Sequence, residues 1–415
     1  MSFSYRNGVL HAEGVALDSI ARQFGTPCYV YSRAAIESAY DEYAGVLRGT
    51  NALVCYSVKA NSNLAVLSLL AQRGAGFDIV SGGELARVLA AGGAAGKTVF
   101  SGIGKSAAEI ELALEKGVLC INVESEAELE RVDAIAQARK VRAPIAFRVN
   151  PDIDARTHPY ISTGLRENKF GVAFDDAERL YMRAARMPGI EIVGLGCHIG
   201  SQLTRSSPYI EAAGRLVALA DRLQKAGLAL RHLDFGGGIG IRYQEESAEP
   251  ISTFLDGVLG LAAGRRETLI VDPGRSIVGN AGVIVTRIEY VKTGAARSFL
   301  VVDAAMNDLL RPALYGAWHE VRPVRQAQAG AKAAVYDVVG PVCESADFLA
   351  KERLLHAAEG DLLALMSAGA YAAAMGSNYN SRPRPAEVLV EGDRCRLVRR
   401  RETVDELFAL ERFPA

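Results

Sequence analysis

The sequence predicts an α/β protein in which a (β/α)8 barrel is joined to an antiparallel β-domain, and three observations carry this prediction. The chain has 415 residues, which exceeds the usual limit for one hydrophobic core. Apolar strand candidates alternate with helical segments as far as about residue 272, and eight such units in about 250 residues fit a barrel. Beyond that point apolar and polar residues alternate, which is typical of antiparallel strands.

The first 27 residues are predicted to complete the β-domain rather than the barrel. Asn7-Gly8 is a strong hairpin signal between two short alternating runs. A short helix is expected over residues 17–24, because the stop signals Gly25 and Pro27 follow it. The predicted domains are therefore residues 28–276 for the barrel and residues 1–27 plus 277–415 for the β-domain.

Eight strand candidates of the barrel follow a short segment at residues 28–31. Helices are expected between nearly all of them, as at residues 106–116, where Ser106 and Glu109 form a capping box. The candidates begin near Ala52, Gly76, Thr98, Leu119, Pro144, Ile190, Leu230 and Thr268. A doubly wound open sheet shows the same alternation, so the count alone leaves both architectures open.

The second domain is predicted to consist mainly of antiparallel strands. The alternating runs lie at residues 283–291, 298–302, 334–339, 387–390 and 396–399. A Gly392-Asp393 turn joins the last two runs, and a small amphipathic helix is expected over residues 403–410.

The composition is that of an ordinary globular protein, with 49% hydrophobic and 23% charged residues. A net charge of −1 does not suggest a nucleic-acid or membrane-surface partner. The six cysteines form no C-x-x-C pair, so we expect a reduced protein with neither a metal site nor a disulfide scaffold. The N-terminus lacks the pattern of a signal peptide and no apolar run reaches about 20 residues, so a cytoplasmic location is expected.

One lysine, Lys59, follows the first strand of the predicted barrel. In one interpretation its stem packs against apolar neighbours and its ammonium reaches water. In the other it is a desolvated amine with a lowered pKa that forms a Schiff base with a carbonyl group. The position of the lysine does not decide between these interpretations.

Polar residues gather where the predicted strands end, which is where a barrel places its active site. Lys59 follows the first strand; Asp78, Ser81 and Glu84 follow the second; Arg148 and Asn150 end the fifth; His198, Ser201 and Gln202 follow the sixth; Asp234 ends the seventh; Asp272 and Arg275 follow the eighth.

A glycine loop, Gly236-Gly237-Gly238-x-Gly240, follows the seventh strand. Its bare backbone N–H groups are able to approach a phosphate, although tight turns use the same residues. Ser201 and Arg275 could add hydrogen-bond donors to such a site. His198 is either a structural residue or a flat ring placed to stack on an aromatic cofactor.

Residues 56–61, YSVKAN, and residues 76–84, GFDIVSGGE, closely resemble the lysine region of the fold-type III pyridoxal-phosphate decarboxylases, especially the diaminopimelate decarboxylases. The resemblance implies an alanine-racemase-like barrel with pyridoxal 5'-phosphate held on Lys59. Residues 197–202, CHIGSQ, resemble the segment whose histidine lies against the pyridoxal ring. Residues 154–164 extend the resemblance without an assigned chemical role.

The resemblance implies which residues bind the cofactor. They are Lys59, Asp78, His198, Ser201, Gly237, Gly238, Asp272, Gly274, Arg275 and Tyr371. A carboxylate beside the pyridine nitrogen favours its protonated form, which suits decarboxylation, whereas racemases of this fold place an arginine there. The family usually has glutamate at this position and this chain has Asp272, so the backbone must approach the ring or a water must bridge.

The second domain carries three further resemblances, at residues 311–315, 340–347 and 369–380. They imply that Arg275, Arg311, Tyr315, Glu344 and Tyr371 bind substrate and that Cys343, with Lys59, is catalytic. Without the resemblance, Cys343 would be interpreted as an inert buried thiol.

The implied reaction is the decarboxylation of meso-2,6-diaminopimelate to L-lysine and carbon dioxide, the last step of lysine biosynthesis. The implied assembly is a homodimer whose active sites are shared across the interface. Ornithine, arginine and carboxynorspermidine decarboxylases of the same fold are the alternative. Two other classes stay open: a non-catalytic pyridoxal-phosphate carrier, and a barrel hydrolase that uses Asp272 and Glu84 as paired carboxylates.

Overall fold

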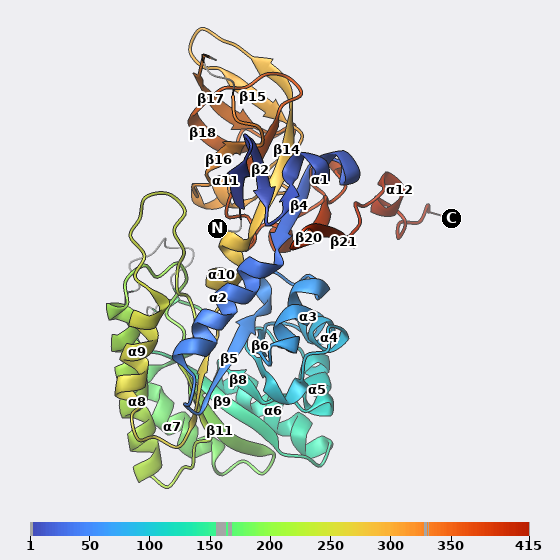
Figure 1. Ribbon diagram of the computed structural model, residues 1–415. Helices are drawn as coiled ribbons and strands as arrows, with labels where there is room; N and C mark the ends of the chain where they lie inside the picture. Colours follow the sequence, from blue (N-terminus) through green and yellow to red (C-terminus); the bar gives the residue numbers. More distant parts are fainter. Residues whose placement is uncertain (1–2, 155–162, 165–167, 328–329, 331, 415) are drawn as a thin grey trace. The chain divides into compact units, whose positions relative to one another are not determined.

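The computed structural model describes residues 3–154, 163–164, 168–327, 330 and 332–414 (Figure 1). The chain divides into two compact units. The first consists of Met1–Ser38, Tyr243–Glu246 and Ile277–Ala415, and the second of Ala39–Arg242 and Ser247–Ser276. The second unit is the barrel, and the first contains the mostly antiparallel sheet.

Among the described residues of the second unit, eight parallel strands close into a barrel. They are β5 (Ala52–Ser57), β6 (Gly76–Ile79), β7 (Thr98–Phe100), β8 (Cys120–Val123), β9 (Ala143–Asn150), β11 (Ile190–Gly196), β12 (His232–Asp234) and β13 (Thr268–Val271). Pairing of β13 with β5, and of β8 with β9, completes the ring. The predicted barrel is confirmed, and the doubly wound open sheet is excluded.

The barrel interior is packed with small and branched apolar side chains. Cys55, Val99, Cys120, Ala146, Val193 and Ile270 form one buried cluster. These residues come from β5, β7, β8, β9, β11 and β13, so neighbouring strands contribute to a common core, as expected for a closed barrel. These side chains fill the interior of the barrel, so a functional site is expected at the ends of the strands.

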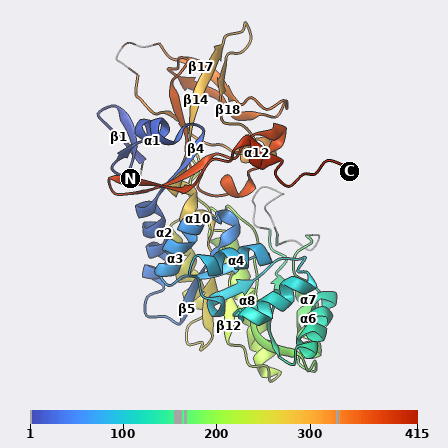
Figure 2. The ribbon, with the colours of Figure 1, turned by 90° about the vertical axis from the view of Figure 1, so that its right-hand side faces the viewer.

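Helices form the outer layer of the barrel (Figure 2). They are α2 (Arg33–Val46), α3 (Leu64–Gln72), α4 (Gly82–Ala90), α5 (Ala107–Lys116), α6 (Glu126–Ala138), α7 (Phe174–Ala184), α8 (Ser207–Lys225) and α9 (Ile251–Leu261). The short helix α10 (Arg275–Val278) follows β13. Ser81, Ser106 and Ser125 cap α4, α5 and α6 with their side chains, and the predicted capping box of Ser106 and Glu109 is present.

The first unit is built on one large sheet and a small N-terminal one. The small sheet contains β1 (Phe3–Arg6), β2 (Val9–Ala12) and β3 (Val15–Ala16), and Asn7 and Gly8 form the predicted hairpin with positive φ angles of 48° and 76°. The helix α1 (Leu17–Phe24) has the predicted bounds.

The large sheet runs in the order β18-β17-β15-β14-β4-β20-β21. The strand β19 branches from β14 and pairs in turn with β16. Its strands are β4 (Cys28–Ser32), β14 (Gly282–Lys292), β15 (Phe299–Val302), β16 (Val321–Pro323), β17 (Ala334–Val339), β18 (Phe348–Leu355), β19 (Leu362–Leu365), β20 (Ala386–Glu391) and β21 (Arg394–Arg399). The terminal helix α12 (Val404–Leu407) is shorter than the predicted one.

Two features of this sheet differ from the sequence-based expectation. The pairs β15–β17 and β4–β20 are parallel, so the sheet is mostly rather than wholly antiparallel. The strand β4 pairs with β14 and β20, and the first unit extends to Ser38, whereas the barrel was predicted to begin at Cys28. An apolar strand of this kind fits either domain locally, and only its pairing partners decide where it belongs.

Within the described residues, no helix combines the length and apolar character that a membrane span requires.

The packing of the barrel makes a prediction about two glycines. In Gly194→Ala, the new Cβ would lie 2.0 Å from Nε2 of the buried His232 ring. We expect overpacking to lower the free energy of unfolding by about 1–3 kcal/mol, measured from the denaturant midpoint. The matched control is Gly260→Ala in α9, where the Cβ meets nothing within 4 Å and helix propensity should add about 0.5–1 kcal/mol. Equal effects of the two substitutions would contradict the packing described here.

Candidate active site

Lys59 lies in a 3-10 turn, Val58–Ala60, directly after β5. Its Nζ donates a hydrogen bond of 2.9 Å to Oδ2 of Asp78 on the neighbouring strand β6. The Asp78 side chain is 1% exposed and the lysine side chain is 36% exposed. The amine is therefore held at the rim of the barrel by a buried carboxylate, rather than simply reaching into water.

Asp272 follows β13 as a buried carboxyl group. Among the described residues, its Oδ1 has no hydrogen-bond partner. Burial raises the pKa of Asp272 well above its usual value, and the carboxyls of Asp234 and Asp78 raise it further, while Lys59 and Arg148 oppose the shift. A buried carboxyl with an open oxygen fits a cationic partner, and a protonated pyridine nitrogen is one.

His198 is a neutral ring at the same end of the barrel. Burial lowers its pKa well below the usual value, and the charges of Arg148 and Lys59 lower it further. Its Nδ1 accepts a hydrogen bond from the Gly237 N–H at 3.4 Å and lies 3.9 Å from Asp272 Oδ1. The proton therefore resides on Nε2, and an uncharged flat ring of this kind is suited to stacking.

The glycine loop needs its glycines because the backbone passes very close to its neighbours. A Cβ on Gly237 would lie 2.2 Å from the Asp272 carbonyl oxygen and 2.5 Å from Asp272 Oδ1. Gly238 has a φ of +92°, and a Cβ there would lie 2.0 Å from the Gly200 oxygen. The loop after β12 thus lies in close contact with the loops after β11 and β13, and only glycine fits there. We call this loop, residues 236–240, the glycine cradle.

The two predicted phosphate donors contact each other. Ser201 Oγ accepts hydrogen bonds from Arg275 Nε at 3.3 Å and from Arg275 Nη2 at 3.0 Å. Gly274, the residue before Arg275, packs against Ser57 and Ala60, where a Cβ would lie 2.9 Å and 3.0 Å from their Cβ atoms. The loop after β13 therefore sits against the turn that carries Lys59. The structure brings together all the predicted cofactor residues of the barrel.

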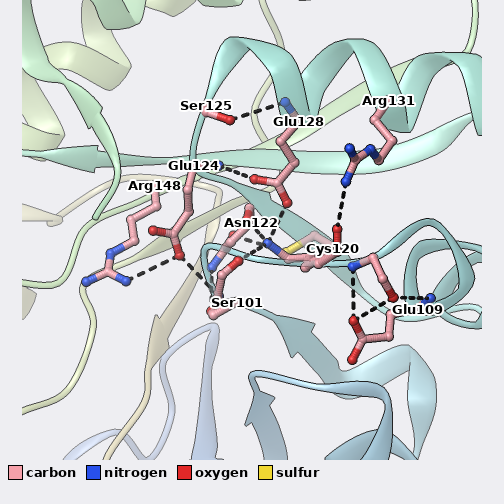
Figure 3. Close-up of polar contacts among 12 residues, drawn as sticks. Ser101, Glu109, Cys120, Asn122, Glu124, Ser125, Glu128, Arg131 and Arg148 are labelled. Atoms are coloured by element: carbon pink, nitrogen blue, oxygen red, sulfur yellow. Dashed lines mark hydrogen bonds and ion pairs between the residues drawn. The ribbon is translucent and has the colours of Figure 1, made fainter. Parts of the chain in front are cut away.

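Several barrel residues were given no role from the sequence. Asp234 ends β12, accepts the Gly236 N–H at 2.9 Å and has a pKa raised to about 7, chiefly by burial. Arg148 pairs with Glu124, which follows β8 (Figure 3). The position of Asp234 and Arg148 at strand ends was a usable signal, whereas Glu124 stands in a run, VESE, that predicts only a helix start.

The first unit contains the remaining predicted residues. Arg311 is buried at the start of α11 (Arg311–Tyr315), and its Nη1 lies 2.9 Å from Nε2 of His319. The Tyr243 ring lies 4.4 Å from the guanidinium carbon. His319 Nδ1 is 2.8 Å from the Met366 carbonyl oxygen, so Nδ1 donates to Met366 and Nε2 accepts from Arg311. The orientation of Arg311 is therefore fixed from two sides.

Cys343 is exposed, so it is not the buried thiol that would be expected without the resemblance. Its backbone N–H donates to Asn380 Oδ1 at 2.8 Å. The loop that carries it is fastened by Asp347, whose carboxylate accepts the backbone N–H groups of Met306 and Val342 at 2.7 and 2.8 Å. Glu344 is also exposed on this loop. The loop is thus anchored while its thiol and carboxylate remain accessible.

Tyr371 adopts a left-handed backbone conformation with a φ of 54°. Nearby, a Cβ on Gly369 would lie 1.8 Å from the Val278 oxygen, and the Ala368 N–H donates to the Gly282 oxygen at 2.7 Å. This segment is therefore held close to the start of β14. Of the segment 154–164 noted in the sequence, residues 155–162 lie outside the described residues.

A cavity of about 940 Å³ lies at the opposite end of the barrel, lined among others by Ala52, Arg231 and Thr268 at strand starts. Barrel enzymes react at the carboxyl ends of their strands. The site is therefore placed at the Lys59 end.

A lysine at the mouth of a parallel barrel, a glycine cradle and an open buried carboxyl define a class of pyridoxal-dependent enzyme. Residues 33–279 match the family described as the pyridoxal binding domain of the pyridoxal-dependent decarboxylases. Within that class, the chain belongs to the diaminopimelate decarboxylase family.

Relatives match along nearly the whole chain. The diaminopimelate decarboxylase of Pseudomonas aeruginosa is 57% identical over 99% of this chain and 98% of its own length. The Helicobacter pylori enzyme complexed with L-lysine has a TM-score of 0.92 at 43% identity, covering 95% of this chain and 99% of that one. The diaminopimelate decarboxylase from M. jannaschii in co-complex with L-lysine has a TM-score of 0.94 at 34% identity, covering 100% of this chain and 98% of that one.

The glycine cradle leads to a prediction about cofactor affinity. In Gly237→Ala, the methyl group would collide with Asp272, so the loop must move. We expect the dissociation constant of pyridoxal phosphate, measured by visible absorbance titration, to rise at least about tenfold. The control is Gly214→Ala in α8, where a Cβ would lie 4.0 Å from Leu261 Cδ1. Unchanged affinity in Gly237→Ala would remove this loop from the cofactor site.

Proposed function

We propose that this chain decarboxylates meso-2,6-diaminopimelate to L-lysine and carbon dioxide with pyridoxal phosphate as its cofactor. In a cell that makes its own lysine, this is the last biosynthetic step. The observation that carries the proposal is the 57% identity to a diaminopimelate decarboxylase over 99% of the chain, which includes both units.

The residues of the barrel fit the cofactor. Lys59 would supply the amine that holds the cofactor through its aldehyde, and Asp78 orients that amine. The ring of His198, which burial keeps neutral, would be the group that stacks on the heterocycle. The remaining cofactor contacts are assigned to Ser201, Gly237, Gly238, Gly274, Arg275 and Tyr371, several of which offer donors to a phosphate.

Bound pyridoxal phosphate supplies a sink for the electron pair that the departing carboxylate leaves at Cα. Asp272 would support this, because a buried carboxylate with an open oxygen favours the protonated form of a pyridine nitrogen placed beside it. An arginine in its place would disfavour that proton, so the acid suits a decarboxylase better than a racemase.

The residues of the first unit are assigned to the substrate and to proton return. Arg311 binds the distal carboxylate through its fixed guanidinium, Tyr315 adds a hydrogen bond, and Glu344 pairs with the distal ammonium. Arg275 and Tyr371 contribute further substrate contacts. The Cys343 thiol carries the proton that is delivered to Cα, and its exposure is consistent with this role.

The exposed Cys343 loop supports a homodimer in which each active site combines residues of two subunits. We also propose that the enzyme works in the cytoplasm, where its cysteines remain reduced.

The alternatives are less well supported. A lysine/ornithine decarboxylase from Vibrio vulnificus matches with a TM-score of 0.80 at 24% identity, which indicates a common fold alone. A non-catalytic carrier would leave the Cys343 loop and Arg311 without a role. For a hydrolase, Glu84 is poorly placed, because its carboxylate accepts the Val80 N–H at 2.7 Å and no interaction with Asp272 is found among the described residues.

Substrate choice tests the assignment of Arg311. Arg311→Lys keeps a positive charge but loses the planar fork, so kcat/KM for meso-diaminopimelate should fall about 30–100-fold with the cofactor absorbance unchanged. Carbon dioxide release is measured for meso-diaminopimelate, ornithine and arginine. If ornithine or arginine outran meso-diaminopimelate in the unmodified enzyme, Arg311 would not be the distal clamp.

Hybrid dimers test the shared site. A Lys59→Ala chain and a Cys343→Ala chain are each expected to be nearly inactive. Mixing them should restore part of the activity, because some hybrid dimers then contain one site with both residues intact. Native mass spectrometry verifies that hybrids form. Complete lack of rescue in verified hybrids would show that each site is built from one chain.

A further inference from the structure

Glu124 lies at the centre of a buried polar network at the carboxyl ends of β7, β8 and β9 (Figure 3). Its side chain is 0% exposed. Its Oε1 accepts hydrogen bonds from the Gly102 N–H at 3.1 Å and from Arg148 Nη1 at 3.4 Å, and its Oε2 accepts the Gly171 N–H at 3.0 Å. One carboxylate therefore joins three loops of the barrel mouth.

Arg148 is held on two sides by this arrangement. Glu124 pairs with one edge of the guanidinium, and the Phe170 ring lies 4.7 Å from its central carbon. The Arg148 side chain is only 13% exposed, so solvent screens this pair weakly. A guanidinium that is both paired and stacked has little freedom to reorient.

A second ion pair, Lys105–Glu128, holds the backbone of Glu124. Lys105 Nζ donates to the Gly102 oxygen at 2.6 Å, to the Asn122 oxygen at 2.7 Å and to Glu128 Oε1 at 2.7 Å, which uses all three of its protons. The other oxygen of Glu128 accepts the Glu124 N–H at 2.8 Å. The side chain of Lys105 is 0% exposed, and a buried pair of this kind serves geometry more than net stability.

The charge of Arg148 acts on the proposed active site. Arg148 on β9 is paired with Gly196 of β11, which lies two residues before His198. Its charge lowers the pKa of His198 and that of Asp272, two groups that face the cofactor in the proposed function. Lys59 acts in the same direction on both, but it is consumed in binding the cofactor. Arg148 takes no part in that condensation and keeps its charge, so its position matters.

We propose that Glu124, supported by the Lys105–Glu128 pair, is a positioning residue that fixes the Arg148 guanidinium where its charge favours the anionic cofactor. This inference rests on the proposed function. Glu124 acts through Arg148 and not by touching the cofactor.

Two other roles of Glu124 make different predictions. If Glu124 acted through its own negative charge, removing that charge would strengthen the binding of an anionic cofactor. If it only fastened loops, its loss would lower stability and add independently to the loss of Arg148. Positioning through Arg148 predicts weaker binding that does not add to the effect of removing Arg148.

The experiment measures the dissociation constant of pyridoxal phosphate by visible absorbance titration of cofactor-free protein. The variants are Glu124→Gln, Glu124→Asp, Arg148→Gln and the double variant Glu124→Gln/Arg148→Gln. We expect about tenfold weaker binding in Arg148→Gln, about five- to tenfold in each Glu124 variant, and no further loss in the double variant. Glu124→Asp keeps the charge but is a methylene too short to reach all three donors.

The matched control is Glu109→Gln. Glu109 also joins loops through backbone groups, since it accepts the N–H of Gly82 at 2.8 Å and of Ser106 at 3.0 Å, and no ion pair with an arginine is found for it among the described residues. Its cofactor affinity should stay within about twofold of the unmodified protein. Unfolding temperatures of all variants separate folding defects from binding defects, and Glu124→Asp carries the test if Glu124→Gln does not fold.

Tighter or unchanged binding in the Glu124 variants, or an additive loss in the double variant, would overturn the inference. If the proposed function itself were wrong, the unmodified protein would bind no pyridoxal phosphate, and this result is distinct from any of the variant outcomes.

Discussion

The barrel mouth depends on the pairing of buried charges. Asp78, Asp234 and Asp272 are all buried, and their mutual repulsion together with burial raises the pKa of Asp234 and of Asp272. Such a group of carboxyls is stable only when protons or cations compensate it. The ammonium of Lys59 is hydrogen-bonded to Asp78 and offsets part of this negative charge. The lysine that the proposed chemistry needs therefore also stabilises the buried carboxyls.

Close backbone packing sets the dimensions around these charges. The glycines at 237, 238 and 274 each lie where a Cβ would meet a neighbouring loop at 2.0–3.0 Å. The loops after β11, β12 and β13 are consequently drawn together with the turn of Lys59. Polar side chains that are far apart in the sequence reach one site because nothing larger than hydrogen separates the loops.

Much of the fold could be predicted from the sequence, because local signals were strong. The barrel strands are short apolar runs, and serine caps mark several of the helices that follow. The placement of β4 could not be predicted, since the run CYVYS fits any buried strand and only its pairing with β14 and β20 decides. The parallel pairs of the first unit depend on the same long-range contacts.

Site residues at the ends of strands could be predicted from the sequence. Residues that act through contacts between loops could not. Asp78, His198 and Asp272 stood out by position, and the resemblance to a family supplied their roles. Glu124 gave no such signal, because its partners Gly102, Arg148 and Gly171 are separated by tens of residues and meet only when the barrel closes. Cys343 could not be distinguished by sequence from the buried cysteines, since exposure is a property of the folded chain.

The pairing of charges also shows where a ligand cation belongs. Glu128 faces Lys105, Glu124 faces Arg148 and Asp78 faces Lys59, so each of these buried carboxylates has its own cation. Asp272 differs from them. His198 Nδ1 lies 3.9 Å from Asp272 Oδ1, but burial lowers the pKa of His198 and keeps its ring neutral. Since a buried carboxylate without a cation is strongly disfavoured, the open oxygen of Asp272 is where the protonated ring nitrogen of the cofactor would complete the series.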